Sequence, residues 1–347
     1  LGLWPFLQFG FEAVVVEATP VMPLALVLWG AAIAAALGTV WFQSERVVAV
    51  ILAGVVGLAV SVVFAYFSAP DLALTQLAVE VVTTLVMLMA LALLPQSTPA
   101  ESKRRRKLRD AVLAVSAGTG VAALSWAVLT RGQESIAWYF LANSLPRGGG
   151  ANVVNVLLVD FRGFDTFGEI TVLSLAAMGA WRVTAGLRVE RPAVTRPSEA
   201  TGTMFAVAAR LLMPFTILVA IYLFLRGHNR PGGGFLAGLV VAIALIMQYM
   251  GEGLQHTLTR IRIDFSILLG FGLLLAALTG FIGMFTGAPF LTSAAVHPHV
   301  PLLGEIPLAS ATAFDLGVFM AVLGTTLLTV TALGKARRKL SSPGEVL

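Results

Sequence analysis

Long apolar segments separated by shorter polar ones run through most of the chain. Because a helix needs about 20 apolar residues to cross a hydrocarbon layer of ~30 Å, segments of this length predict membrane-spanning helices. The pattern predicts an all-α, polytopic integral membrane helix bundle of about nine transmembrane helices. The predicted spans lie at about residues 22–42, 47–67, 68–95, 111–129, 165–183, 204–225, 234–251, 265–285 and 310–333.

The composition agrees with a membrane protein. The 347 residues are 58% hydrophobic and 12% charged, and the mean hydropathy of +0.89 excludes an ordinary soluble protein. The chain has no cysteine, which excludes disulfides, iron–sulfur clusters and thiolate metal sites within it. The net charge of +5 does not indicate nucleic-acid binding, because the basic residues gather in polar segments between apolar runs.

Two polar segments organise the chain. Residues 95–110 carry a run of basic side chains, and residues 186–203 contain prolines and arginines. We expect the second to be a cytoplasmic linker between a five-span module, residues 1–185, and a four-span domain, residues 204–347. Most of the 23 lysines and arginines then fall on one side, and the positive-inside rule makes that side, with the 95–110 segment and the C-terminus, cytoplasmic.

Three segments do not fit the pattern of spans. Residues 1–20 are apolar and aromatic but interrupted, which favours an interfacial or peripheral position. Residues 152–161 are too short to cross the membrane and either lie in the interface or re-enter. The tail from residue 335 is polar, and we expect it to fray. Since the chain begins with Leu1 and no basic signal region precedes the first span, we expect a processed chain or a fragment of a longer polypeptide.

The third span carries an acid within the predicted hydrocarbon layer. Glu80 is the only ionisable residue between Leu72 and Leu94, and it lies about 14 Å along the helix from Asp71. An acid at that depth is costly unless it is protonated, paired or hydrated, so it marks an ion path by default. The alternative is a protonated glutamate that bonds a neighbouring helix. Gln76, Thr83 and Thr84 share the face of Glu80, Asp71 points roughly opposite, and the predicted path includes Glu80, Asp71, Thr75, Gln76, Thr83 and Thr84.

A second group of charges precedes the fifth span. Asp165 and Glu169 share a helical face, and Arg162 can pair with Asp165 or with Asp160. One interpretation is an acidic mouth that concentrates cations; the other is a helix start with a solvated ion pair. Oxygen atoms of the nearby Asn152 and Asn155 suit a hard cation such as Na⁺.

The segment between the sixth and seventh spans contains His228, Asn229 and three consecutive glycines, Gly232, Gly233 and Gly234. The glycines permit positive φ or close backbone approach, and they predict either an interface or a tight packed turn. No Gly-Lys-Ser/Thr sequence follows, so this is not a phosphate loop. His228 is able to titrate near neutral pH, although a structural role is also open.

Further polar residues flank the last spans. Asp315 lies in the second turn of the ninth span, so it is, like Glu80, an acid beneath the membrane surface, although at a smaller depth. His297 and His299 offer at most a weak metal pair on an extended segment, so no metal site is predicted beyond transient Na⁺ at Glu80 or Asp165/Glu169. Glu252 and His256 are interpreted as boundary residues of the seventh span.

All four lysines lie in predicted loops, at Lys103, Lys107, Lys335 and Lys339. A proton-pumping helix bundle of the antiporter type needs buried lysines alternating with acids. The chain is therefore not expected to be a complete proton pump by itself.

Four motifs resemble one family. The sequence SAPDLALTQLAVEVVTTLVMLMAL resembles the segment after the antiporter-like core in the A subunit of Mrp-type multisubunit cation/proton antiporters, and ANVVNVLLVDFRGFDTFGEITVL is similar to the segment that follows. FLRGHNRPGGGFLAGLV and PLASATAFDLGVF resemble the two signatures of the B subunit. The order implies the C-terminal part of the A subunit fused to the B subunit, without the antiporter-like part of the former. Related segments occur in membrane-bound hydrogenases and, more distantly, in complex I.

The resemblance implies that the chain is a subunit of a bacterial inner-membrane complex that exchanges cytoplasmic Na⁺ for outside protons. It implies a transporter subunit and not an enzyme, and it implies no cofactor. Its partners would be antiporter-like and small membrane subunits, the lipid bilayer, Na⁺ and H⁺. It also implies a role for Glu80 on the ion path and for Asp160, Asp165 and Glu169 near its entrance. Two alternatives stay open: a linker module of a redox-driven ion pump and a purely structural membrane scaffold.

Overall fold

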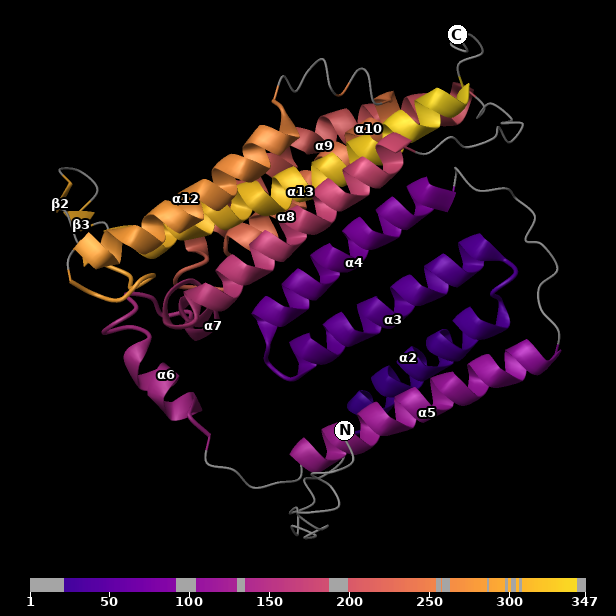
Figure 1. Ribbon diagram of the computed structural model, residues 1–347, viewed down its shortest axis with the longest axis horizontal. Coiled ribbons are helices and arrows are strands. Elements are labelled where there is room, and N and C mark those ends of the chain that lie inside the picture. Colours follow the sequence, from indigo (N-terminus) through magenta and orange to yellow (C-terminus); the bar gives the residue numbers. More distant parts are fainter. Residues whose placement is uncertain are drawn as a thin grey trace. The chain divides into compact units, whose positions relative to one another are not determined.

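The computed structural model forms two compact units: Leu1–Pro23 with Gln96–Trp138, and Leu24–Pro95 with Tyr139–Leu347. Most of the second unit is helical (Figure 1). The structure describes residues 22–91, 104–129, 135–186, 199–253, 257, 263–285, 287–296, 299–300, 304–305 and 308–341. The predicted interfacial segment 1–20, His256, His297 and Lys103 lie outside these residues.

The described part of the chain has 8 helices that are long and apolar enough to cross a membrane. This confirms an all-α, polytopic membrane protein. They are α2 (Pro23–Trp41), α3 (Arg46–Tyr66), α4 (Pro70–Leu91), α5 (Arg104–Leu129), α9 (Glu199–Arg226), α10 (Gly234–Glu252), α12 (Phe265–Phe285) and α13 (Ser310–Ser341). The ninth predicted span is α8 (Gly163–Gly186), which is long enough but carries Asp165, Glu169 and Arg182 and is not in this set.

Several helices extend beyond the predicted spans. α5 begins at Arg104, inside the segment predicted to be a polar linker, and α9 begins at Glu199, inside the predicted 186–203 linker. α13 continues to Ser341, where a frayed tail was expected. The reason is that Arg, Lys, Glu and Ala are good helix formers, so the apolar core of a span does not mark where its helix ends.

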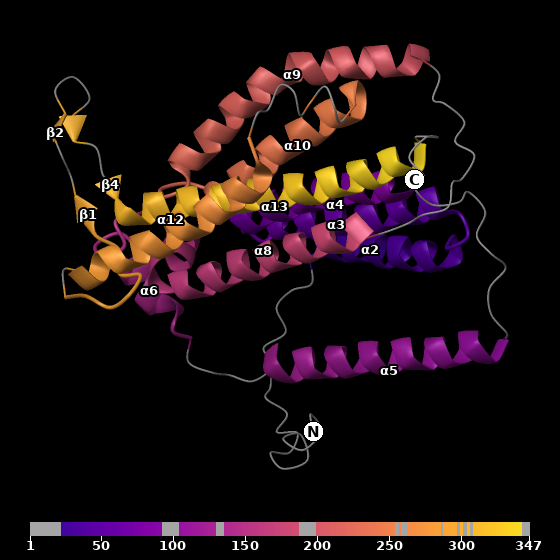
Figure 2. The same ribbon diagram turned by 45° about the horizontal axis from the view of Figure 1, so that its top comes forward.

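In the second unit α13 packs between α8, α10 and α12, while α4 packs against α3 and α10 (Figures 1 and 2). Small residues permit the closest approach. A Cβ on Gly272 of α12 would lie 2.7 Å from the carbonyl oxygen of Gly317 on α13. Phe314 and Ile246 are fully buried in the core that these helices share. Small residues at such contacts let helix backbones pack tightly in a membrane.

The segment 152–161 folds into one turn of α-helix, α7 (Val153–Val156), followed by a short π-helix, η1 (Leu157–Phe161). α6 (Ala137–Asn143) precedes it. The segment is too short to cross a membrane, as predicted, and it packs against α8 and α13. Val156 and Val159 are buried, and so are the polar side chains of Asn152 and Asn155.

Four two-residue strands lie between α12 and α13 and are the only strands in the described residues. β1 (Ala295–Val296) pairs with β4 (Leu308–Ala309), and β2 (His299–Val300) pairs with β3 (Gly304–Glu305), both antiparallel. His299 is therefore on an extended segment, as expected. Among the described residues no group of three or more His, Asp or Glu side chains could hold a metal ion.

Candidate ion-binding site

The glycine run between α9 and α10 forms a tight turn that presses against α9 and α13. Gly233 has φ +108 and precedes the first residue of α10. Its N–H donates to the carbonyl oxygen of Leu223 at 3.0 Å, and a Cβ on Gly232 would overlap that same carbonyl group. Both predicted uses of glycine, positive φ and close approach, are therefore found in this one loop.

Asp315 lies at the N-terminus of α10, although it belongs to α13. Its Oδ2 accepts a hydrogen bond of 2.8 Å from the Gly234 N–H. The Asn155 amide is nearby, since a Cβ on Gly233 would lie 2.8 Å from the Asn155 nitrogen and 3.4 Å from Asp315 Oδ2. A Cβ on Gly234 would overlap the backbone carbonyl of Asp315. Only 8% of Asp315 is exposed. The unpaired N–H groups of a helix start carry partial positive charge, so this position favours a negative group.

Asp71 faces the same loop from the first turn of α4. Its Oδ1 accepts hydrogen bonds from the Gly232 N–H at 3.0 Å and from Asn152 Nδ2 at 3.3 Å. Asn152 is the N-cap of α7: its Oδ1 accepts from the N–H groups of Val154 and Asn155. Since that oxygen already bonds two backbone donors, the structure gives Asn152 a structural role in place of the cation contact considered from the sequence.

His228 bridges the loop to α7. Its Nε2 lies 3.0 Å from the carbonyl oxygen of Gly148, and its Nδ1 lies 3.3 Å from Oδ1 of Asn155. Asn155 is buried, and its Oδ1 faces His228. The next loop residue, Asn229, accepts a hydrogen bond from the Ala151 N–H at 3.2 Å. The loop residues singled out from the sequence therefore fix the 148–155 segment in place.

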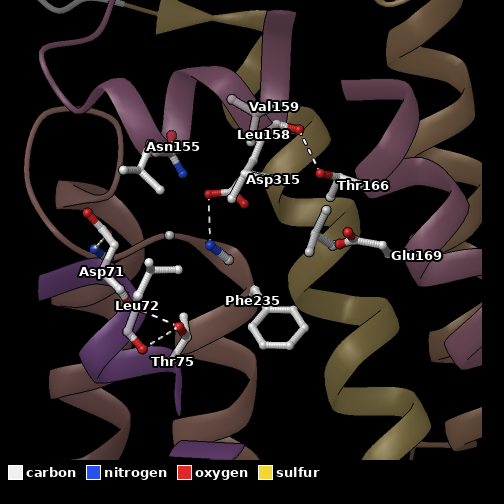
Figure 3. A pocket seen from close by; sticks show the side chains of 15 residues that line it. Asp71, Leu72, Thr75, Asn155, Leu158, Val159, Thr166, Glu169, Phe235 and Asp315 are labelled. Carbon is white, nitrogen blue, oxygen red and sulfur yellow. Dashed lines mark hydrogen bonds between the residues drawn. The ribbon is translucent and has the colours of Figure 1, made fainter. Parts of the chain in front are cut away.

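A cavity of about 210 Å³ opens between these groups (Figure 3). Asp71, Asp315 and Glu169 lie on three sides of it, each from a different helix. At about 30 Å³ per water, the volume suits several waters or a partly hydrated cation. Polar members of the lining also include Thr75, Asn155 and Thr166, and Gly232, Gly233 and Gly234 contribute backbone. The cavity combines negative charge with room for water in an otherwise apolar bundle.

Glu80 lies elsewhere, at the contact between α3 and α4. Its carboxylate packs over Gly57 of α3, where a Cβ would overlap it, and its Oε1 accepts a hydrogen bond of 3.2 Å from Thr84. Thr83 instead bonds the carbonyl oxygen of Val79 at 2.9 Å. Glu80 and Gln76 are half-buried. As predicted, Asp71 faces away from this stripe, and only Asp71 and Thr75 of the six α4 residues line the cavity.

The acidic cluster around the start of α8 separates into three environments. Arg162 pairs with Asp165 at 2.5 Å, and their side chains are 62% and 45% exposed. Such a pair contributes about 0–1 kcal/mol, as a solvated ion pair at a helix start would. Asp160 accepts a hydrogen bond from the Ser293 N–H at 2.9 Å. Burial raises the pKa of Asp160, and the Ser293 N–H and the nearby His228 oppose that change. Glu169 alone lines the cavity.

One ionic contact was not predicted. Glu252, interpreted from the sequence as a boundary residue, has only 5% of its side chain exposed and pairs with Arg210 of α9 at 2.5 Å. Gln248 donates a hydrogen bond of 3.1 Å to the other carboxylate oxygen, Oε2. The available signal was a pair of opposite charges near the same end of two consecutive spans.

Three family models match the chain. One is described as a domain related to the MnhB subunit of Na⁺/H⁺ antiporter and matches residues 204–328. The models MbhE and MbhD, described as the E and D subunits of MBH, match residues 104–201 and 31–96.

Curated relatives extend the likeness over nearly the whole chain. A probable K⁺/H⁺ antiporter A/B subunit of Rhizobium meliloti is 40% identical over 96% of this chain and 36% of its own length. The B subunit of the Na⁺/H⁺ antiporter of Alkalihalophilus pseudofirmus is 40% identical over 36% of this chain and 87% of its own. The chain therefore spans about a third of the A/B relative and most of a separate B subunit.

A solved structure agrees in fold as well. A chain in the structure of the Mrp complex from Dietzia sp. matches with a TM-score of 0.80 and 32% identity. The match covers 91% of this chain and 35% of that one.

Proposed function

Because this chain belongs to the family of A and B subunits of Mrp-type multisubunit cation/proton antiporters, we propose that it lines a cation route in such a complex. Residues 1–185 would be the C-terminal membrane module of the A subunit, residues 186–203 a cytoplasmic linker, and residues 204–347 the domain that corresponds to the B subunit. The complex would extrude Na⁺ in exchange for H⁺, as the names of most relatives suggest. The K⁺/H⁺ name of one relative makes K⁺ the alternative cargo.

The cavity bounded by Asp71, Glu169 and Asp315 is the observation that supports this proposal. Three carboxylates around a small volume concentrate cations and protons, which compete for the same negative charge. Asp71 and Asp315 are held by backbone N–H groups of the glycine loop. Their positions therefore do not depend on a bound cation, and either cargo would enter a site that is already formed.

Glu80 would be a second ion-binding position on α4, the helix that carries Asp71. It lies about 14 Å from Asp71 along α4, so the two acids sit at different depths. Among the described contacts, the half-buried carboxylate of Glu80 accepts one hydrogen bond, from Thr84 of its own helix. We assign transient contact with the cation to Glu80 and to Glu169, beside the exposed Asp165.

The proposed setting is a bacterial inner membrane, with the 95–110 segment and the C-terminus in the cytoplasm. The proposed partners are the antiporter-like and small membrane subunits of the same complex. Because all four lysines stand in polar segments of the sequence, the relay lysines would come from the antiporter-like subunits. The exposed apolar faces of helices such as α2 suit contact with lipid or those subunits.

The test is Na⁺-dependent proton movement in inverted membrane vesicles that carry the whole complex. We would compare wild type with Asp71→Asn, Glu169→Gln and Glu80→Gln, with assembly checked by native gel. Asp110→Asn is the control, because Asp110 is 56% exposed and pairs with its neighbour Arg109. We expect the first three variants to lose most exchange and the control to keep it. Unchanged exchange in all three assembled variants would reject the route.

A second function is favoured by the match of residues 31–96 and 104–201 to the two MBH models. This would be a linker module of a redox-driven ion pump. In vesicles it would show as ion movement that starts on addition of an electron donor and does not need a Na⁺ gradient. A purely structural scaffold would instead keep normal exchange after loss of the acids.

A further inference from the structure

The last turn of α10 carries a buried acid. Glu252 is the final residue of this helix, and only 5% of its side chain is exposed. The last carbonyl groups of a helix have no partner within it and carry partial negative charge, so this end disfavours an acid and favours a cation. Glu252 therefore needs a positive partner where it stands.

Arg210 of α9 supplies that positive charge from the solvent side. Its Nε and Nη2 both donate to Oε1 of Glu252, at 2.8 and 2.5 Å, while 57% of its own side chain is exposed. The two donors share one carboxylate oxygen, so the pair lacks the two-oxygen geometry in which a guanidinium binds a carboxylate most strongly. Arg210 thus neutralises Glu252 without being buried with it.

Gln248, one turn before Glu252, has an amide oxygen without a hydrogen-bond donor. The residue is fully buried, and its Nε2 donates to Oε2 of Glu252 at 3.1 Å. Oε1 of the same amide is one of two buried side-chain atoms in the described residues that have no hydrogen-bond partner. Turning the amide over would leave the nitrogen unpaired and set the oxygen against the carboxylate. In both orientations the amide lacks a partner beside Glu252.

A carboxylate and an amide oxygen side by side are suitable ligands for a hard cation. A buried acceptor without a partner is costly, so such groups normally bind a protein donor, water or an ion. The guanidinium of Arg210 is directed at Glu252 and leaves Oε1 of Gln248 unpaired. Hard cations take carboxylate and amide oxygens together with water. A small cation would therefore serve both side chains at once.

We propose that Glu252 and Gln248 bind a monovalent cation such as Na⁺ at the end of α10, in competition with Arg210. The cation lies between a carboxylate oxygen of Glu252 and Oε1 of Gln248, and waters complete its shell of ligands. Arg210 then turns its guanidinium into the solvent, where most of its side chain already lies. One positive charge replaces another, so the buried carboxylate keeps a counter-charge throughout.

This position is at the opposite end of α10 from the acidic cavity. α10 begins at Gly234, which lines the cavity, and it ends at Glu252. At 1.5 Å per residue the two ends are about 27 Å apart, close to the ~30 Å of a hydrocarbon layer. The cavity and the Glu252 position therefore lie near opposite faces of the membrane. The role of the second position in exchange rests on the proposed function, whereas cation binding at Glu252 does not.

The test is infrared difference spectroscopy of the complete complex in lipid, with the buffer changed between Na⁺ and choline at constant pH and ionic strength. The stretching bands of a carboxylate shift when a small cation replaces a guanidinium beside it. We expect Na⁺-dependent bands in wild type, of which one part disappears in Glu252→Gln. The double variant Glu252→Gln with Arg210→Met removes both charges together, and it gives the same subtraction if the single variant fails to assemble.

Two further variants change the Na⁺ concentration that half-saturates the Glu252 bands. Arg210→Met removes the competing charge and keeps a long side chain, so this concentration should fall several-fold. Gln248→Leu removes the amide oxygen, so the concentration should rise several-fold. Arg182→Met is the matched control, because Arg182 is an exposed arginine of α8, and it should leave the concentration unchanged.

Glu252 bands that are identical in Na⁺ and in choline would overturn the proposal and make the contact with Arg210 a permanent structural ion pair. A water bound at Oε1 of Gln248 would give the same result, because water does not compete with a guanidinium for the carboxylate. Assembled Arg210→Met and Gln248→Leu complexes that both keep the wild-type half-saturating concentration would also reject the proposal.

The two proposals fail in different ways. A Na⁺ response at Glu252 together with normal exchange in the Asp71, Glu169 and Glu80 variants would keep this site and reject the cation route. Loss of exchange in those variants with no response at Glu252 would do the opposite.

Discussion

Asp71 accepts a hydrogen bond of 3.0 Å from the backbone N–H of Gly232, which lies 161 positions later in the chain. Asp71 belongs to the segment that resembles the A subunit, and Gly232 belongs to the segment that matches the MnhB-related domain. The candidate site is therefore built from both halves of the chain.

The contact between Gly234 and the backbone of Asp315 predicts that Gly234→Ala destabilises the bundle. A Cβ there overlaps a carbonyl group, which cannot rotate away, and overpacking of this kind costs about 1–3 kcal/mol. The measurement is the thermal unfolding of the purified complex. Gly270→Ala in α12 is the control, because a Cβ at Gly270 meets nothing within 4 Å, and it should leave stability unchanged or slightly higher.

The buried hydrogen bonds of Asn152 predict a similar loss of stability on substitution, for a different reason. Its amide nitrogen donates to the Gly227 and Arg230 carbonyls, both at 3.0 Å, while its oxygen caps α7. Asn152→Ala leaves these buried groups unpaired, and we expect a loss of about 1–3 kcal/mol. Hydrogen exchange should show faster opening of the 227–233 loop. Asn143→Ala, which removes one exposed bond to the Tyr139 carbonyl, should not.

The position of Glu80 against α3 can be tested without changing the acid. Gly57→Ala introduces a methyl group where the Glu80 carboxylate lies, so the flexible side chain must move away. If Glu80 contacts the cation, exchange in vesicles should fall although the charge is retained. Gly30→Ala in α2, where a Cβ meets nothing within 4 Å, should keep exchange. Equal exchange in the two assembled variants would count against a role for Glu80.

The partly buried position of Asp160 predicts that the stability of the protein depends on pH. Burial raises its pKa in the folded protein, so the protonated form is favoured there. The stability that this group contributes is present below its unfolded pKa and is lost as pH rises through the folded pKa. Asp160→Asn keeps an acceptor for the Ser293 N–H and carries no charge. We expect the variant to unfold at a higher temperature than wild type at neutral pH, with the difference disappearing in acid. A difference that stays constant across pH would contradict this cause.

The spans could be predicted because hydropathy is a local property. For α12 the predicted and observed limits coincide, since polar residues stand immediately outside both ends. The starts of α5 and α9 could not be predicted from apolarity, because basic and small residues extend a helix beyond the hydrocarbon layer. The buried pair of Arg210 and Glu252 was missed because it depends on how α9 packs against α10.

In the candidate site, too, the sequence predicted some features and only the packing of the helices decided the others. Sequence alone identified Asp71, Asp315, His228 and the glycine run as unusual, because charge and glycine carry a physical cost inside a membrane. It placed Glu80 at the centre and grouped Asp160, Asp165 and Glu169 together. The structure separates those three acids and brings Glu169 to Asp71 and Asp315.

The sequence by itself determined the class of the protein, most of its spans and the residues that are costly where they stand, since these follow from composition and local periodicity. Only the tertiary structure decided which of these residues meet. Asn152 and Asn155, which carry no charge, gain their partners from a loop more than seventy residues later in the chain. Hydrogen-bond partners of that separation are set by packing, because local sequence does not specify the angle at which helices cross or the depth to which a loop descends.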